Sequence, residues 1–165
     1  MIGIVVRDLE SRDLEELADL IKMIYSERPS AMWFESPPDS EAIKKLFEYK
    51  INGIGEGRVV DVISEEERRI IGECEVVNLP GGVGYLGILV RKEFRMRGVG
   101  RSLLIAASER ARELGTSRLK VDVTEDNLDA MYFLTKNGFR RMAGRDHSVS
   151  INGSPYRVIT LEKEL

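Results

Sequence analysis

The sequence feature that most constrains the fold is an apolar run that passes directly into a basic, glycine-containing helix start. Residues 84–90 are mostly apolar, as expected for a strand buried on both faces. Residues 91–101 then carry five basic side chains and one acidic side chain, and Gly98 and Gly100 open an amphipathic segment. Glycine lets a backbone approach a ligand closely, and the first turn of a helix presents unpaired N–H donors. This junction predicts a pyrophosphate site; a solvated basic loop is the simpler alternative.

Hydrophobic spacing and turn residues predict an α+β domain around this junction. The expected order is β-α-α-β-β-β-α-β-α-β-β, a mixed, mainly antiparallel sheet of six to seven strands flanked by about four helices. No linker or repeat interrupts the chain, so residues 1–165 are expected to form a single domain. Strands are expected at Ile2–Arg7, Arg58–Ser64, Arg69–Val77, Gly84–Val90, Arg118–Thr124, Arg140–Ser150 and Tyr156–Leu161. Helices are expected at Asp13–Tyr25, Asp39–Ile51, Val99–Leu114 and Asn127–Asn137.

Charge and cysteine content argue against several classes of protein. The 165 residues have a net charge of −3, which disfavours general nucleic-acid binding. Cys74 is the single cysteine and His147 the single histidine, so we expect neither a disulfide nor a zinc site. We interpret Cys74 as a core residue and His147 as a surface residue. No run approaches the ~18 apolar residues that cross a membrane, and the N-terminal segment lacks the pattern of a signal peptide. We therefore expect a cytoplasmic protein with no metal, nucleic-acid or membrane partner.

The same glycines are compatible with a second nucleotide-binding pattern. Gly98-Val99-Gly100 could begin the dinucleotide fingerprint G-x-G-x-x-G, with Asp122 as the downstream acid. However, Leu103 occupies the third glycine position, and the element order lacks alternating parallel β-α units. A nicotinamide-dependent oxidoreductase is therefore the weaker alternative.

Residues 95–100, Arg-Met-Arg-Gly-Val-Gly, resemble the R/Q-x-x-G-x-G/A motif of the GNAT superfamily of N-acetyltransferases. A second block, with Asn127, Ala130, Gly138 and Phe139, is similar to that family's N-x-x-A…G-F pattern. The expected element order also matches the family from end to end. The resemblance implies a GNAT-like fold, acetyl-CoA as co-substrate, and direct transfer to a primary amine in a ternary complex. The amine could belong to a small molecule, a peptide N-terminus or a lysine side chain.

The resemblance also assigns residues to the cofactor. It implies that backbone N–H groups of residues 96–101 hold the pyrophosphate and that the pantetheine arm pairs with residues 88–90 like an added strand. Asn127 either contacts this arm or is a plain helix N-cap. The expected cofactor-binding residues are Ile88, Leu89, Val90, Arg95, Met96, Arg97, Gly98, Val99, Gly100, Arg101 and Asn127.

The sequence departs from the family at the catalytic acid. A tyrosine usually lies four residues before the glycine of G-F and protonates the departing thiolate, but this chain has Leu134 there. Tyr132 lies two residues earlier, about 200° around a helix, and is the weaker candidate. Water, Tyr85 or Tyr156 could protonate the thiolate instead. The missing tyrosine also leaves open a non-catalytic acyl-CoA-binding module on the same fold.

Three carboxylates are candidates for the base that an amine acceptor needs, because only the neutral amine attacks. Asp122 lies five residues before Asn127, where some family members carry a catalytic carboxylate. Glu73 and Glu75 would share one face of a strand and could hold a water, with Cys74 pointing to the opposite face. The alternative for the two glutamates is a solvent-facing sheet edge.

Acceptor specificity is expected to come from the Pro-bounded segment between the first two helices. Trp33, Phe34 and Glu35 are the expected substrate-binding residues there, together with Tyr85. Glu35 and the overall acidity favour a cationic acceptor. The alternative is a hydrophobic plug over the core. The sequence leaves the identity of the amine open, as well as the choice between a monomer and a homodimer.

Overall fold

A computed structural model describes residues 3–165. An eight-stranded sheet has the order β1-β2-β3-β4-β5-β8-β6, with β7 paired to β8. The parallel pair is β4–β5, and the other pairs are antiparallel. The strands are β1 Val5–Asp8, β2 Val59–Glu66, β3 Arg69–Leu79, β4 Val83–Val90, β5 Arg118–Thr124, β6 Arg140–Arg141, β7 His147–Ile151 and β8 Ser154–Glu164. The α-helices are α1 Leu14–Glu27, α2 Ser40–Gly55, α3 Val99–Glu113 and α4 Leu128–Lys136. Short 3₁₀ turns lie at Ser11–Asp13, Pro29–Ala31 and Lys92–Phe94.

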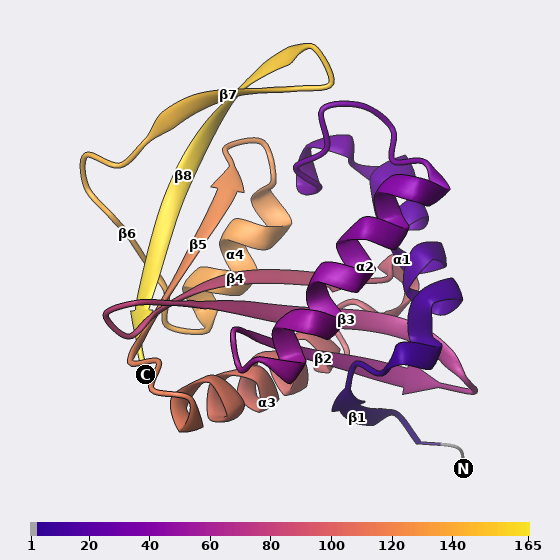
Figure 1. The fold of residues 1–165 in the computed structure, drawn as a ribbon. Helices are drawn as coiled ribbons and strands as arrows, with labels where there is room; N and C mark the ends of the chain where they lie inside the picture. Colours follow the sequence, from indigo (N-terminus) through magenta and orange to yellow (C-terminus); the bar gives the residue numbers. More distant parts are fainter. Residues whose placement is uncertain (1–2) are drawn as a thin grey trace.

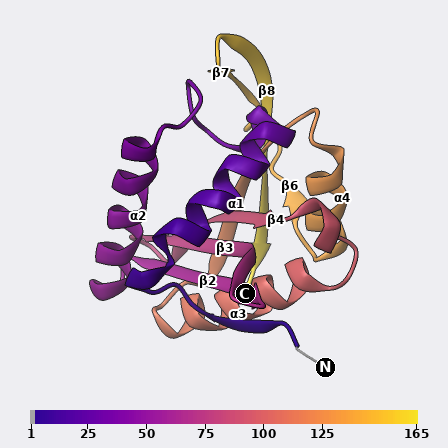
Figure 2. The same ribbon diagram turned by 90° about the vertical axis from the view of Figure 1, so that its right-hand side faces the viewer.

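The helices form a layer on each side of the sheet, so the structure has two hydrophobic cores. Figure 2 shows α1 and α2 on one side and α3 and α4 on the other. Leu17, Leu20 and Ile24 of α1 recur at helical spacing and pack with Phe47 of α2 over the sheet. The opposite core gathers α3 and α4 against β2, β3, β4, β5 and β8, and the buried Cys74 belongs to it, as predicted. In the described residues, no helix is long and apolar enough to cross a membrane.

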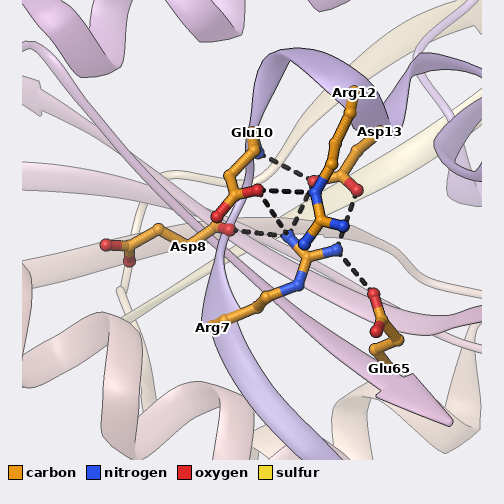
Figure 3. Close-up of polar contacts among 6 residues, drawn as sticks. All are labelled: Arg7, Asp8, Glu10, Arg12, Asp13 and Glu65. Carbon is orange, nitrogen blue, oxygen red and sulfur yellow. Dashed lines mark hydrogen bonds and ion pairs between the residues drawn. The ribbon is translucent and has the colours of Figure 1, made fainter. Parts of the chain in front are cut away.

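A charged network holds the first strand to the start of α1. The guanidinium of Arg7 donates to both carboxylate oxygens of Asp13 at 2.8 Å and to Glu65 of β2 at 2.5 Å (Figure 3). Asp13 is buried and also accepts from the backbone N–H of Glu10 at 2.8 Å. Although burial raises the pKa of Asp13, the hydrogen bonds from Arg7 and Glu10 lower it below its usual value. The network fixes where the chain leaves β1 and enters α1.

Most element boundaries differ from the sequence expectation by one to three residues, and three differences have a clear local cause or lie at the edge of the described residues. The first strand runs Val5–Asp8, and the expected start at Ile2 lies outside the described residues. Helix α2 continues past Ile51 to Gly55, since Gly53 lets the helix approach Val59; a Cβ there would lie 2.4 Å from the Val59 side chain.

The expected strand at Arg140–Ser150 is instead two strands, β6 and β7, because residues 143–146 leave the ladder after Met142, whose N–H still donates to the carbonyl of Thr160 at 2.8 Å. Gly144 adopts a φ of 74° in this excursion. The following hairpin is as predicted: Asn152 and Gly153 form a two-residue turn, both with positive φ.

Candidate active site

The site begins where two parallel strands separate. Strands β4 and β5 pair only from Val83–Arg118 to Tyr85–Lys120. Beyond this point β4 continues to pair with β3, and β5 with β8, so the two facing edges have no ladder partner across the gap. Unpaired backbone groups at such an edge need hydrogen-bond partners. A cavity of about 330 Å³ lies in this opening, and it is lined by both strands, the segment after α1, and parts of α2 and α4.

A buried cluster of four charged side chains forms one wall of the cavity. The Nζ of Lys50 lies 3.0 Å from Asp61 and 2.7 Å from both Glu73 and Glu75. Lys50, Asp61 and Glu73 are at most 4% exposed. Lys50, Glu73 and Glu75 line the cavity directly. The alternative in which Glu73 faces solvent at a sheet edge is therefore wrong, because α2 covers this part of the sheet.

The protonation of this cluster follows from its burial. Burial alone lowers the pKa of Lys50, but attraction by Glu73, Asp61 and Glu75 raises it well above its usual value. Burial, and then repulsion by Glu73, raise the pKa of Asp61 well above normal. The cluster thus holds one fixed ammonium and one carboxyl group that favours its proton, with Glu73 and Glu75 as the remaining acids. Three acidic side chains thus surround one ammonium, and this excess of acidic groups favours a cation in the cavity.

Asp122 approaches the same cavity from β5. The hydroxyl of Thr160, its cross-strand neighbour on β8, donates to Asp122 Oδ1 at 2.6 Å. Asp122 makes no salt bridge with a basic residue in the described chain. Glu73, Glu75 and Asp122 therefore line one cavity, as two of the sequence hypotheses for a base required.

The expected acceptor segment supplies the rim of the cavity only in part. Trp33 and Phe34 both line it; Phe34 packs edge-to-face on Tyr25, while Trp33 is 50% exposed at the surface. Glu35 is exposed and does not line the cavity. Tyr85 lines a smaller neighbouring cavity instead. The segment is thus partly core cover and partly cavity rim.

The predicted phosphate loop lies between β4 and α3. Gly98 is the N-cap of α3 with a φ of 82°, and no side chain of residues 3–165 caps the first turn. Met96 also has a positive φ, 62°, and is 88% exposed. The N–H groups of this turn thus remain open to an anion. Gly100 has a packing reason as well: a Cβ there would lie 3.0 Å from the ring of Phe133 on α4.

The arginines of this loop are not all directed at a ligand. Arg95 donates from Nε to the carbonyl of Val90 at 2.9 Å, and its two terminal nitrogens contact the Glu27 carboxylate at 2.5 and 2.9 Å. Arg97 lies over the ring of Phe94, 5.6 Å from its centroid. Arg95 therefore braces the loop against the end of α1, a contact that the motif alone does not predict.

Helix α4 places Asn127 at the cavity, as expected, but does not place Tyr132 there. The Asn127 side chain accepts from Ala130 N–H at 3.3 Å as an N-cap, and the residue also lines the cavity. Leu134 is buried and lines the cavity at the usual tyrosine position. Tyr132 is 60% exposed, with Lys136 over its ring, and does not line the cavity.

Sequence reasoning missed Lys50 and Asp61, although both leave a signal. Lys50 follows Ile43 and Phe47 at helical spacing, so it falls on the apolar face of α2. Asp61 interrupts the β-branched run of β2. A lysine and an acid at two otherwise apolar positions indicate a buried ion pair.

Comparison with known proteins identifies the fold and the family of this chain. No curated protein matches the sequence of this chain. Among solved structures, a ribosomal-protein-alanine N-acetyltransferase from Brucella melitensis superposes with a TM-score of 0.82 at 22% identity, covering 98% of this chain and 99% of that one. A phosphinothricin acetyltransferase from Sinorhizobium meliloti in complex with acetyl-CoA gives 0.80 at 18% identity, covering 98% and 88%. The PaiA N-acetyltransferase from Thermoplasma acidophilum, in complex with coenzyme A, gives 0.74 at 19% identity, covering 99% and 100%.

These likenesses confirm the GNAT fold expected from the sequence. The sequence itself matches the acetyltransferase (GNAT) family over residues 16–139, which is most of its length. The chain therefore belongs to the GNAT family of acetyltransferases, and acetyl transfer is the activity of that family.

Proposed function

We propose that this chain transfers the acetyl group of acetyl-CoA to a primary amine, by direct attack of the amine in a ternary complex. One observation carries the proposal: the unpaired edges of β4 and β5 open onto a cavity whose wall holds Glu73, Glu75 and Asp122. A site for an extended, strand-like ligand and a site for an ammonium group thus share one opening. The acceptor class follows from the charge of this wall.

Three parts of the chain fit the donor. Residues 88–90 offer an unpaired strand edge to the pantetheine arm, and the uncapped turn at residues 96–101 offers N–H groups to the pyrophosphate. Asn127 lies on the cavity wall beside them. The bound thioester supplies an activated acetyl carbon. A backbone N–H of β4 would stabilise the negative charge that develops on its oxygen.

The acidic wall prepares the acceptor. An amine in neutral water is mostly protonated, so an ammonium is drawn to the cavity and must then lose a proton. Glu73 and Glu75 receive this proton, directly or through a water, while Lys50 holds both carboxylates in place. Asp122, on the opposite strand, is the second candidate base. After attack, the nitrogen of the tetrahedral intermediate loses its second proton as the C–S bond breaks. Because Leu134 occupies the usual tyrosine position, water accepts this proton and delivers one to the departing thiolate.

Incubation of the purified protein with acetyl-CoA and a panel of amines tests the proposal. The panel contains polyamines, free amino acids, amino-acid amides, and peptides with either a free N-terminus or a free lysine. We expect CoA thiol release that depends on one amine class, and a mass increase of one acetyl group on that amine. Tight acetyl-CoA binding without product from any amine would contradict the proposal and favour the non-catalytic module.

A further inference from the structure

A second, smaller cavity lies beside the proposed acceptor site. It has a volume of about 170 Å³, and Asp122 lines both cavities. Tyr85, Lys120 and Asp122 share the face of the sheet that carries Glu73 and Glu75, because alternate residues of paired strands point the same way. The two cavities are thus neighbours on one face, with Asp122 between them.

The second cavity is basic, in contrast to the first. Lys120 and Arg145 line it, and neither forms an ion pair with a carboxylate of residues 3–165. His147 also lines it, and its Nδ1 lies 3.1 Å from the carbonyl oxygen of Arg145. Two free cations around a small cavity form a site for an anion.

Two acids near the second cavity, Asp146 and Glu162, are paired with other arginines. Asp146, next to Arg145, accepts hydrogen bonds from Arg141 and Arg157, and the bond from Arg141 lowers the pKa of Asp146. Glu162, opposite Lys120 on β8, lies 3.9 Å from Arg118. Arginines outside the cavity therefore pair with Asp146 and Glu162, while Lys120 and Arg145 have no ion-pair partner within residues 3–165. Asp122 is the carboxylate that lines the second cavity itself, so the cavity has two cationic side chains and one acidic side chain.

The phosphates of the donor do not fit as the anion. Their expected site follows Val90 at the open end of the gap, whereas the second cavity borders Tyr85, the last residue of β4 paired with β5. Five residues of strand separate the two positions, about 17 Å at the usual rise. The anion must then come from the acceptor.

We infer that the acceptor carries an acidic group in addition to its amine, as a free amino acid does. The ammonium would lie against Glu73 and Glu75, and the carboxylate would bind Lys120 and Arg145 on the far side of Asp122. This inference rests on the proposed function and narrows its acceptor class, since a polyamine offers nothing to the second cavity.

Matched acceptors and matched variants test the inference. Each active amino acid is compared with its carboxamide, which keeps the amine but lacks the negative charge. Lys120→Met and Arg145→Gln should each lower kcat/KM for the acid by roughly 10- to 100-fold, the effect of one lost charged hydrogen bond. The same variants should change kcat/KM for the carboxamide less than about threefold, within the size of a weak surface effect.

An amino acid and its carboxamide differ in the basicity of their amines, but this difference is the same for every variant. It therefore cancels when the acid-to-carboxamide ratio of kcat/KM is compared between each variant and the wild type. Lys44→Met and Arg112→Gln change exposed residues outside both cavities and serve as controls. Equal losses for acid and carboxamide, or no loss for either, would overturn the inference. Acetylation of polyamines or peptides, but of no free amino acid, would overturn it while leaving the proposed function intact.

If no amine is turned over, the proposed function is contradicted, but a binding measurement can still test the inference. Calorimetric titration of the CoA-saturated protein with the free amino acids should show binding to the wild type, weakened by Lys120→Met. Absence of binding to the wild type, or binding unaffected by Lys120→Met and Arg145→Gln, would refute the anion site.

Discussion

Replacement of Lys50 by methionine is the most direct test of the buried cluster. The substitution keeps the length of the side chain but removes an ammonium that lies 2.7–3.0 Å from three carboxyl groups. Breaking a buried ion pair by removing one partner typically costs about 3–5 kcal/mol, since the remaining charge is left uncompensated. We therefore expect the free energy of unfolding to fall by about this amount at pH 8.

The loss should depend on pH, with a defined sign. The raised pKa of Asp61 means that the folded state binds more protons than the unfolded state above the ordinary pKa of an aspartate. Stability from this group is therefore present at low pH and lost as pH rises. In Lys50→Met the buried carboxyl groups lose their ammonium partner and take up protons instead. The free energy of unfolding therefore falls more steeply with rising pH than in the wild type. The deficit should be at least about 1.4 kcal/mol smaller at pH 5 than at pH 8, the equivalent of one pKa unit on one group.

Urea unfolding of both proteins at the two pH values measures these differences. Lys45→Met, at an exposed position of the same helix, is the matched control and should lie within about 0.5 kcal/mol of the wild type. The double variant Lys50→Met/Glu73→Gln should recover part of the loss, because it removes one of the uncompensated charges. A deficit below about 1 kcal/mol, or one that is equal at both pH values, would refute the account of the cluster.

Four further changes test other parts of the site. Gly98→Val should abolish acetyl-CoA binding in a calorimetric titration, because the φ of 82° is strained for a residue with a side chain and the turn must change to relieve it. The same strain should lower the free energy of unfolding by about 1–3 kcal/mol, although the added Cβ meets no atom of residues 3–165 within 4 Å; unchanged affinity would remove the phosphate assignment. Asp122→Asn should lower kcat most at low pH if Asp122 is the base, and an unaltered pH–rate profile would exclude it. Leu134→Tyr should preserve or raise kcat, whereas a severe loss would show that the cavity needs the space that the leucine leaves. Asp13→Asn should cost about 1–3 kcal/mol in urea unfolding at pH 7 through its bonds to Arg7. Because the folded pKa of Asp13 is lowered, this cost should shrink as pH falls below about 4, and a cost independent of pH would contradict it.

The fold was predictable because its strongest signals are local. The apolar run at β4, the glycines before α3 and the turn at Asn152 and Gly153 each constrain only a few neighbouring residues, and the element order follows from them. The split between β6 and β7 was missed because residues 143–146 leave the ladder in an irregular turn, in which Asp146 bonds back to Arg141 and across to Arg157 of β8, and no clear turn motif marks this excursion in the sequence.

The candidate site was predictable only where it is built from contiguous residues. The contact between Lys50 and Asp61 depends on the rotation of α2 and on the register of β2 with β3, neither of which a single sequence states. For the same reason the sequence left open whether Glu73 is a base or lies at a solvent-facing sheet edge, whereas in the structure α2 covers it. The motif identified Arg95 as a loop residue but gave no information about Glu27, its partner 68 positions away.

The brace between Arg95 and Glu27 has a consequence for the kinetics of the enzyme. The end of α1 contacts the loop after β4 through this pair, and Arg28 contacts Asp126 after β5 at 3.2 Å. Figure 1 shows β4 and β5 diverging towards these ends. The segment that follows, with Trp33, forms the rim where an acceptor would enter. An acceptor that shifts this rim would therefore also displace the loop after β4 and the turn after β5, which flank the proposed coenzyme site. The two substrates should then not bind independently of one another.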